Sequence, residues 1–178
     1  MSQRPIQARD AVTPPRTAAG IDGLRLRDAR PDDQPRIVEV INAAYKPRDW
    51  HIFRQLRTSA EDYPFELNRR RSYGIVAELD DAIVAHVCLK IHGSEAEFGL
   101  LATLPDFQGR GIARRMIDEC ETRARAAGCD VMALDAVREV GMQPYYESLG
   151  YVLHQEEQTE QWGAKQPWTH IFMRKSLR

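Results

Sequence analysis

The sequence predicts a single mixed α/β domain over residues 21–178, with a mostly antiparallel central sheet flanked by helices. Two observations predict this fold class. Three short segments of alternating apolar residues follow one another over residues 73–103, which is typical of an antiparallel meander. An amphipathic helix pattern over residues 111–127 then lies between two strand patterns, and a strand–helix–strand unit places its strands in parallel. The sheet is therefore expected to contain one parallel pair.

Length and composition are those of an ordinary soluble domain. The chain has 178 residues, of which 43% are hydrophobic and 29% charged, and its formal net charge is -1. This balance predicts no nucleic-acid partner, and no apolar run approaches the roughly 20 residues needed to cross a bilayer. The three cysteines form no C-x-x-C pair and indicate a reducing, cytoplasmic compartment. The scattered histidines predict no metal site.

The N-terminal part of the chain changes character near residue 20. Residues 1–20 contain three prolines and few bulky apolar groups, so we expect a flexible tail. Alternating leucines and arginines over residues 23–29 predict a strand. A helix should start at Pro31 and end at the Lys46–Trp50 segment, because that segment contains a proline. Further helical stretches follow over residues 51–71, interrupted by Pro64.

The middle of the chain provides the meander. Strands are predicted over Tyr73–Glu78, Ala82–Ile91 and Glu95–Thr103, joined by short polar turns. The second of these strands contains His86. We interpret this histidine as a packed or hydrogen-bonded strand residue rather than a catalytic one. Cys88 lies in the middle of the same strand, and no histidine is directly adjacent to it in the sequence to activate it as a nucleophile.

The C-terminal part should complete the sheet. A strand is predicted over Asp130–Val137, another begins within Tyr151–Gln155, and a polar loop over Glu156–Pro167 leads to a closing strand over Trp168–Leu177.

A glycine-rich turn stands between the third strand of the meander and the amphipathic helix. It contains Gly109 and Gly111, flanked by Arg110 and Arg114. Glycine allows close backbone approach, and the unpaired N–H groups of a first helical turn attract anions. The spacing fits neither the P-loop nor the dinucleotide fingerprint. The turn is therefore expected to bind a different phosphate ligand.

Two motifs resemble one known family. Gln108, Gly111 and Ala113 fit Gln/Arg-x-x-Gly-x-Gly/Ala between a strand and a helix, which resembles the acetyl-CoA signature of the GNAT superfamily of N-acetyltransferases. The segment Tyr145–Tyr151 resembles the family's Tyr-Glu-x-x-Gly-Phe/Tyr. The resemblance covers roughly residues 23–177. It implies a GNAT-like fold, in which two adjacent parallel strands splay apart.

The resemblance also implies acetyl-CoA as the acetyl donor. Leu101, Ala102 and Thr103 would offer backbone partners to the pantetheine arm, which would lie along the strand like an added strand. Gln108 would open the turn. The CoA pyrophosphate would be bound mostly through the backbone N–H groups of Gly109, Arg110, Gly111, Ile112, Ala113 and Arg114.

Catalysis in this family is direct attack of an amine on the thioester. Tyr146 occupies the position of the motif tyrosine and would protonate the leaving thiolate, whereas Tyr145 is expected in the core. The group that accepts the proton of the amine stays open among Glu97, Asp135 and water. Some members carry an asparagine seven residues before the motif tyrosine; here that position is Glu139, so that polar contact is not transferred.

The acceptor is expected to be a small-molecule or peptide amine, bound by the segments 45–71 and 156–167. A runner-up function is a non-catalytic acyl-CoA-binding sensor or regulatory module on the same fold. Dimerisation is common for such domains, and the sequence assigns no surface to a homodimer.

Overall fold

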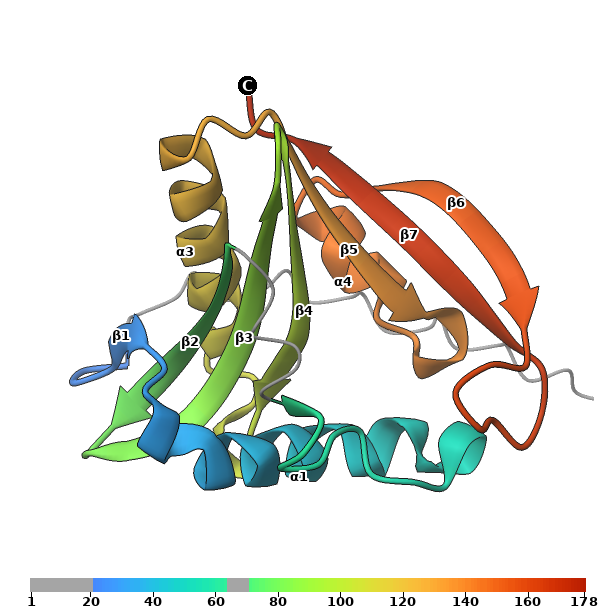
Figure 1. The fold of residues 1–178 in the computed structure, drawn as a ribbon, viewed down its shortest axis with the longest axis horizontal. Helices are drawn as coiled ribbons and strands as arrows, with labels where there is room; N and C mark the ends of the chain where they lie inside the picture. The colour runs from blue at the N-terminus through green and yellow to red at the C-terminus, as the bar shows by residue number, and fades with distance from the viewer. Residues whose placement is uncertain (1–20, 64–70) are drawn as a thin grey trace, which may run out of the picture.

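A computed structural model describes residues 21–63 and 71–178 and shows one seven-stranded sheet of order β1-β2-β3-β4-β5-β7-β6 (Figure 1). β4 and β5 run in parallel, and the other neighbouring strands are antiparallel, so the predicted mixed sheet is confirmed. The expected tail and Pro64 lie outside the described residues. The strands are β1 (Arg25–Asp28), β2 (Ser72–Leu79), β3 (Ala82–His92), β4 (Glu95–Thr103), β5 (Val131–Val137), β6 (Val152–Thr159) and β7 (Trp168–Ser176).

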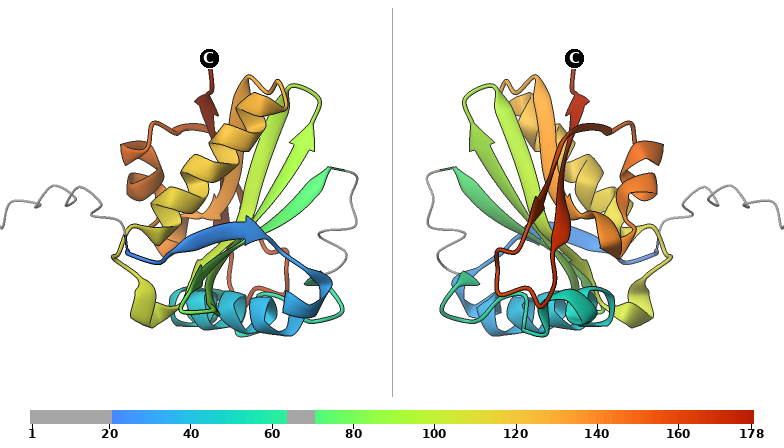
Figure 2. Two further views of the ribbon diagram at one scale, coloured as in Figure 1. Left: turned by 90° about the vertical axis from the view of Figure 1, so that its left-hand side faces the viewer. Right: turned by 90° about the vertical axis from the view of Figure 1, so that its right-hand side faces the viewer.

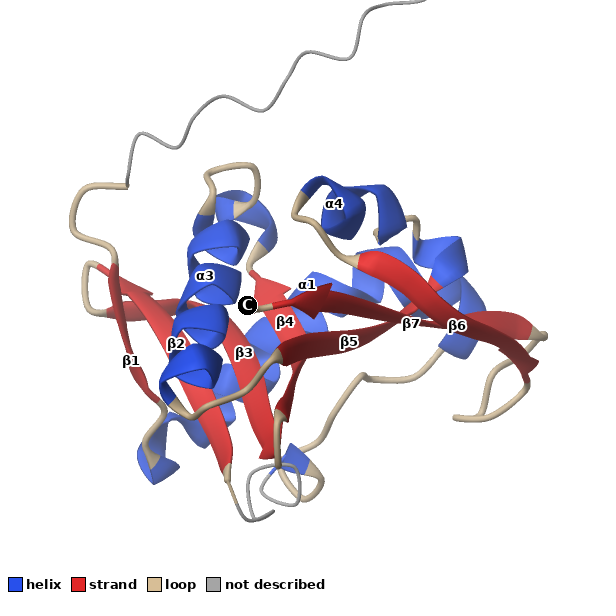
Figure 3. Cartoon of the chain, turned by 90° about the horizontal axis from the view of Figure 1, so that it is seen from above, coloured by secondary structure: helices blue, strands red, loops and turns tan. Residues whose placement is uncertain are grey.

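Helices cover both faces of the sheet. The long helices α1 (Gln34–Phe53) and α3 (Ile112–Ala126) pack on opposite sides, and the short helix α4 (Gln143–Ser148) lies on the α3 side, beside β5 (Figures 2 and 3). Alternation along β2 explains the two cores: Ile75 and Ala77 join the cluster with α3, whereas Val76 joins the cluster with α1. None of the described helices combines the length and apolar character that crossing a membrane requires.

Helix α1 is longer than the sequence predicts. The prediction that Lys46–Trp50 ends the helix is wrong, because the helix continues through Pro47 to Phe53. The missing N–H of a proline removes one backbone hydrogen bond. Burial of Ile52 and Phe53 against Trp168 of β7 keeps the helical face continuous beyond that point. Tertiary packing therefore outweighs the local break.

Strand β6 also exceeds its prediction. The segment from Glu156 was expected to be a loop, but pairing continues to Thr159, which is opposite Trp168 of β7. The strand is polar because it lies at the edge of the sheet, with its side chains exposed. An exposed edge strand lacks the apolar face by which a strand is recognised in a sequence.

Strands β4 and β5 splay apart after a short paired region. Pairing joins Glu95–Glu97 to Val131–Ala133, and beyond these residues the two strands diverge, as Figure 1 shows. β5 remains paired with β7 as far as Val137, which lies opposite His170. Over its second half, the edge of β4 that faces β5 therefore has no strand partner among the described residues. The splayed parallel pair expected from the resemblance is present.

A bulge shapes the same half of β4. The register with β3 shifts between His86 and Cys88, which face Ala102 and Gly99. Leu100, in the bulge, has a positive φ of 49°. A left-handed conformation is strained for leucine, so surrounding contacts must hold it.

Candidate active site

The turn before α3 presents unpaired backbone donors. Gly109 and Gly111 have φ values of 72° and 80°, which glycine adopts without strain. Gly111 is the N-cap of α3, and no side chain caps the helix there. The N–H groups of the first turn therefore remain available, with the positive end of the helix dipole behind them. This arrangement suits an anionic group such as a pyrophosphate.

Side chains of the turn have local partners. Gln108 donates through Nε2 to the Thr103 carbonyl at 2.9 Å and accepts from Arg48 at 3.2 Å, so it fastens the turn to the end of β4. Arg110 donates to the Asp106 carbonyl at 2.8 Å, and Arg114 pairs with Asp118 at 2.9 Å. The Ile112 side chain lies in the core, and Ala113 is half-buried. Backbone groups, rather than these side chains, are left to contact a ligand.

The predicted pantetheine segment lies along the splayed edge. Ala102 and Thr103 pair with β3 on one side, and Leu101 stands at the bulge. The Thr103 hydroxyl is buried without a hydrogen-bond partner among the described residues. An extended ligand with amide groups can pair with a strand edge of this kind. The free edge, the orphaned hydroxyl and the uncapped helix together fit acetyl-CoA.

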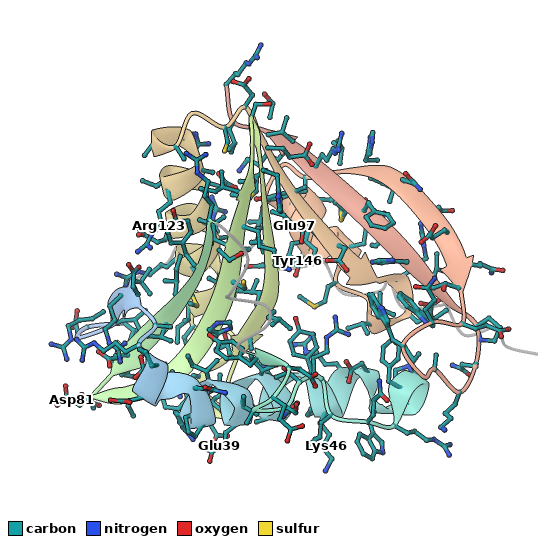
Figure 4. The ribbon with its side chains drawn as sticks, viewed as in Figure 1. Glu39, Lys46, Asp81, Glu97, Arg123 and Tyr146 are labelled. Atoms are coloured by element: carbon teal, nitrogen blue, oxygen red, sulfur yellow. The ribbon has the colours of Figure 1, made fainter. Side chains whose placement is uncertain are left out.

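Tyr146, on α4, lies at the gap between the diverging halves of β4 and β5, which we call the opening. Its side chain is 9% exposed and packs against Phe98 and Tyr151, and Figure 4 places it and Glu97 beside the gap between β4 and β5. Its hydroxyl hydrogen-bonds to no described residue. Burial raises the pKa of Tyr146 above its ordinary value, and the nearby Tyr45, Tyr145 and Asp135 raise it further. The hydroxyl therefore stays protonated at neutral pH. Tyr145, expected in the core, is half-buried beside Tyr146.

The two candidate carboxylates face the same opening. Asp135, Glu97 and Glu95 line a pocket of about 160 Å³ together with Phe172 and Arg174. Asp135 accepts a hydrogen bond at 2.8 Å from Nε2 of His170 on β7. Burial raises the pKa of Asp135, but the hydrogen bond and charge of His170 outweigh it and lower the pKa below its ordinary value. Asp135 is therefore a carboxylate at neutral pH.

Glu97 is set differently from Asp135. Its carboxylate lies 4.0 Å from Lys90 of β3.

His170 is a residue of the site that the sequence does not reveal. It lies 35 residues from Asp135 and forms no motif with it.

The two segments expected to bind the acceptor meet in the structure. Gln55 donates to the Trp162 carbonyl at 2.6 Å, and the Lys165 N–H donates to the Ile52 carbonyl at 2.9 Å. The end of α1 and the loop between β6 and β7 therefore form one wall, as Figure 1 also shows. Aromatic rings line it: the centre of the Trp162 ring is 4.8 Å from that of Trp168, and 5.1 Å from that of His170 in an edge-to-face contact.

Three further residues singled out in the sequence have structural settings. His86 is buried between the Tyr63 hydroxyl, 3.0 Å from Nε2, and the Leu100 carbonyl, 3.2 Å from Nδ1. It thereby supports the β4 bulge. Glu139 accepts the Thr169 N–H at the start of β7. Cys88 is 1% exposed within β3.

Comparisons with known proteins show the family to which the chain belongs. The model of the acetyltransferase (GNAT) family matches residues 37–151. An acetyltransferase of Pectobacterium atrosepticum is 30% identical over 133 residues, which are 72% of this chain and 87% of that protein. The chain belongs to the GNAT family of acetyltransferases.

Solved structures show the same fold at low sequence identity. The ribosomal-protein-S18-alanine N-acetyltransferase of Escherichia coli has a TM-score of 0.71 and 16% identity, and the match covers 86% of this chain and 94% of that one. The PaiA N-acetyltransferase of Thermoplasma acidophilum, solved in complex with coenzyme A, has a TM-score of 0.69 and 18% identity over 86% and 98%. These two likenesses concern the fold alone.

Proposed function

We propose that the protein transfers an acetyl group from acetyl-CoA to a primary amine by direct attack in a ternary complex. The opening between β4 and β5 carries this proposal, because the uncapped turn, the free strand edge and the Tyr146 hydroxyl all border it. When bound, acetyl-CoA supplies an activated acetyl group, whose bond to sulfur breaks as its bond to the amine nitrogen forms.

The donor is held by backbone groups in this proposal. N–H groups from Gly109 to Arg114 bind the pyrophosphate, helped by the dipole of α3. The edge of β4 over Leu101–Thr103 pairs with the pantetheine arm. Gln108 keeps the turn and the strand end in register through its bond to the Thr103 carbonyl.

Tyr146 acts as the general acid. Because its pKa is raised, the hydroxyl is protonated at neutral pH and can donate its proton to the sulfur of the leaving thiolate. The hydroxyl has no competing hydrogen bond to a described residue, so it is free to donate to the leaving thiolate. A positioned acid of this kind contributes roughly 10²–10⁴ in rate.

Asp135 receives the amine. Its carboxylate is ionised at neutral pH and accepts hydrogen bonds from the acceptor nitrogen, whose proton passes to the Asp135–His170 pair directly or through water. Glu97 is the alternative receiver. Asp135 is favoured because its hydrogen bond to His170 orients the carboxylate within the pocket that both acids line.

The test combines binding with turnover. Calorimetry measures acetyl-CoA binding, and thiol release measures transfer to a broad panel of amines. Tyr146→Phe should bind acetyl-CoA as the wild type does and turn over roughly 10²–10⁴-fold more slowly. Tyr73→Phe, at an exposed tyrosine of β2, is the matched control and should change neither quantity.

Two results would contradict the proposal. A folded wild type that binds no acetyl-CoA would exclude the acetyl donor. Tight binding without turnover of any amine would favour the sensor or regulatory module instead.

A further inference from the structure

Arg57 lies in the aromatic wall beside the opening. Its guanidinium carbon is 4.9 Å from the centre of the Tyr45 ring and 5.5 Å from that of the Trp162 ring. Both distances are within the range of cation–π attraction. A cation–π contact holds the guanidinium by its charge and uses none of its N–H donors for a hydrogen bond to oxygen.

The guanidinium of Arg57 donates no hydrogen bond to the described part of the chain. The guanidinium carries five N–H donors. Its ion pair with the Asp49 carboxylate has an N···O distance of 3.9 Å, which is too long for a hydrogen bond. The hydrogen bond that Arg57 donates comes from its backbone, and the guanidinium makes none to a described residue. The side chain is nevertheless 23% exposed. Its nitrogens are not among the buried side-chain atoms that lack a partner, so solvent and an incoming oxyanion can reach them, and a charged hydrogen bond to an oxyanion would be favourable here.

The backbone around Arg57 is fixed before any ligand arrives. Oδ1 of Asn42 on α1 accepts the N–H groups of Arg57 and Thr58 at 2.8 and 3.2 Å, and Nδ2 donates to the Thr58 carbonyl at 2.9 Å. Three hydrogen bonds from one side chain thus hold this segment on the helix. A guanidinium held in this way loses little further entropy when it binds an anion.

Arg57 and Asp135 belong to one continuous set of contacts. The Trp162 ring touches both the guanidinium and the His170 ring, and His170 hydrogen-bonds to Asp135. The charge of Arg57 also contributes to the lowered pKa of Asp135. A cation and a carboxylate therefore border the same acceptor side of the opening.

Other cations near the opening have hydrogen-bonded partners. Arg48 donates to Gln108 and to the Met142 sulfur, on the donor side. Arg174 donates to Glu95 at 3.1 Å. Arg57 differs from these arginines because its side-chain donors have no hydrogen-bond partner within residues 21–63 and 71–178.

We propose that Arg57 binds an anionic group of the acceptor, so that the acceptor is an amine that also carries a carboxylate, as a free amino acid does. This inference rests on the proposed function and names its substrate class. Asp135 would receive the ammonium end and Arg57 the carboxylate, which the planar guanidinium can hold through two parallel hydrogen bonds. An apolar side chain of the amino acid would lie against the exposed face of Trp162.

The test uses acceptor pairs that differ in the carboxylate. Thiol release is measured for L-phenylalanine and 2-phenylethylamine, and for L-lysine and cadaverine, with wild type and with Arg57→Ala, Arg57→Lys and Arg25→Ala. The readout is the ratio of kcat/KM between the members of a pair, compared between variants, because this comparison cancels the intrinsic reactivity of each amine. Two further acceptors refine the comparison. L-Phenylalanine amide replaces the carboxylate with a neutral group, and the aminophosphonate analogue replaces it with another oxyanion.

We expect Arg57→Ala to lower the preference for the carboxylate member by roughly 10- to 100-fold, the usual weight of a charged hydrogen bond. Arg57→Lys should retain part of this preference, because it keeps the positive charge. That result would show that the site is folded and responds to charge. Arg25 is exposed on β1, at the opposite edge of the sheet from β6, and its alanine variant should keep the wild-type ratio.

Two outcomes would overturn the inference. Equal use of both members by the wild type, unchanged in Arg57→Ala, would leave the acetyltransferase proposal standing and remove the carboxylate site. If no amine is turned over at all, calorimetry of L-phenylalanine and L-lysine against the CoA complex decides: binding lost in Arg57→Ala supports the anion site, and absence of binding to wild type rejects it.

Discussion

At the scale of single residues, the charge of Asp135 can be separated from its shape. Asp135→Asn keeps the size of the side chain and removes the negative charge that faces the acceptor. We expect kcat/KM for the amine to fall roughly 10- to 100-fold, because a hydrogen bond to a charged group is lost. Acetyl-CoA affinity should not change, because the donor is held by β4 and α3.

The control for Asp135 is Glu157→Gln. Glu157 lies 3.8 Å from the other ring nitrogen of His170 and is exposed, so its variant should be nearly neutral. If Asp135→Asn is neutral and Glu97→Gln impairs transfer instead, Glu97 is the residue that receives the amine.

The residues of the site differ in how far the sequence reveals them. Tyr146 follows from a motif and Asp135 from its place on a predicted strand. Tyr146 lies beside the gap between β4 and β5 in Figure 4, and Asp135 lines the pocket that it shares with Glu97. Arg57 and His170 belong to no motif. Their settings arise from contacts with Trp162, which lies in a loop far from Arg57 in the sequence. Only the folded chain brings these side chains together.

At the scale of elements, the two ends of α3 allow a matched comparison of glycines. Gly109 precedes the helix with a φ of 72°, and Gly128 follows it with a φ of 82°. A Cβ at either position would meet no atom within 4 Å, so alanine adds the same backbone strain of about 1–2 kcal/mol at both. Gly109→Ala should also weaken acetyl-CoA binding in calorimetry, whereas Gly128→Ala should lower stability alone. Equal acetyl-CoA affinities in the two variants would mean that the turn does not bind the cofactor.

Helix α1 permits a similar comparison of prolines. Pro47 stands inside the helix, whereas Pro35 occupies its first turn, where no N–H donor is needed. Pro47→Ala should raise the free energy of unfolding by about 1–3 kcal/mol, because it restores a backbone donor at some expense in unfolded-chain entropy. Pro35→Ala should have little effect. Denaturant titration measures both, and a destabilised Pro47→Ala would show that packing needs the proline.

The elements themselves were largely predictable, and their ends were less so. Alternation located β2, β3 and β4 to within a residue or two. The end of α1 was missed because burial of Ile52 and Phe53 against β7 overrides Pro47. The end of β6 was missed because its partner β7, rather than its own composition, makes it a strand. Such features depend on contacts that local patterns do not contain.

At the scale of the whole molecule, the splay is a consequence of strand order. β7 lies between β5 and β6, and it continues to pair with β5 where β4 no longer does. The free edge of β4 exists because β5 follows β7 away from it. The resemblance to a family predicted this splay, whereas the sequence patterns predicted the parallel pair alone.

The dependence of overall stability on pH should report the buried His86. Burial lowers the pKa of His86 from 6.5 to about 4. Above pH 6.5 the histidine is neutral in both the folded and the unfolded chain. As the pH falls from 6.5 to about 4, the unfolded chain binds a proton that the folded chain excludes, so stability decreases by about 3 kcal/mol and this contribution then levels off.

Carboxylates with lowered pKa, such as Asp33 and Glu78, act in a lower pH range. Arg27 lowers the pKa of both, so their stabilisation is lost as the pH falls below the ordinary carboxylate values of 3.8 and 4.5. Above these values, in the interval from pH 6.5 to 4.5, Asp49 opposes His86, because burial raises the pKa of Asp49 and the folded chain then gains a proton as the pH falls.

Comparison of the wild type with a His86 variant over this interval isolates the contribution of His86. In denaturant titrations, His86→Asn should flatten the decline over this interval, whereas the exposed His154→Asn should keep it. A wild-type slope in His86→Asn would mean that the proton is bound elsewhere, and that the histidine beneath the β4 bulge is charged in the folded protein.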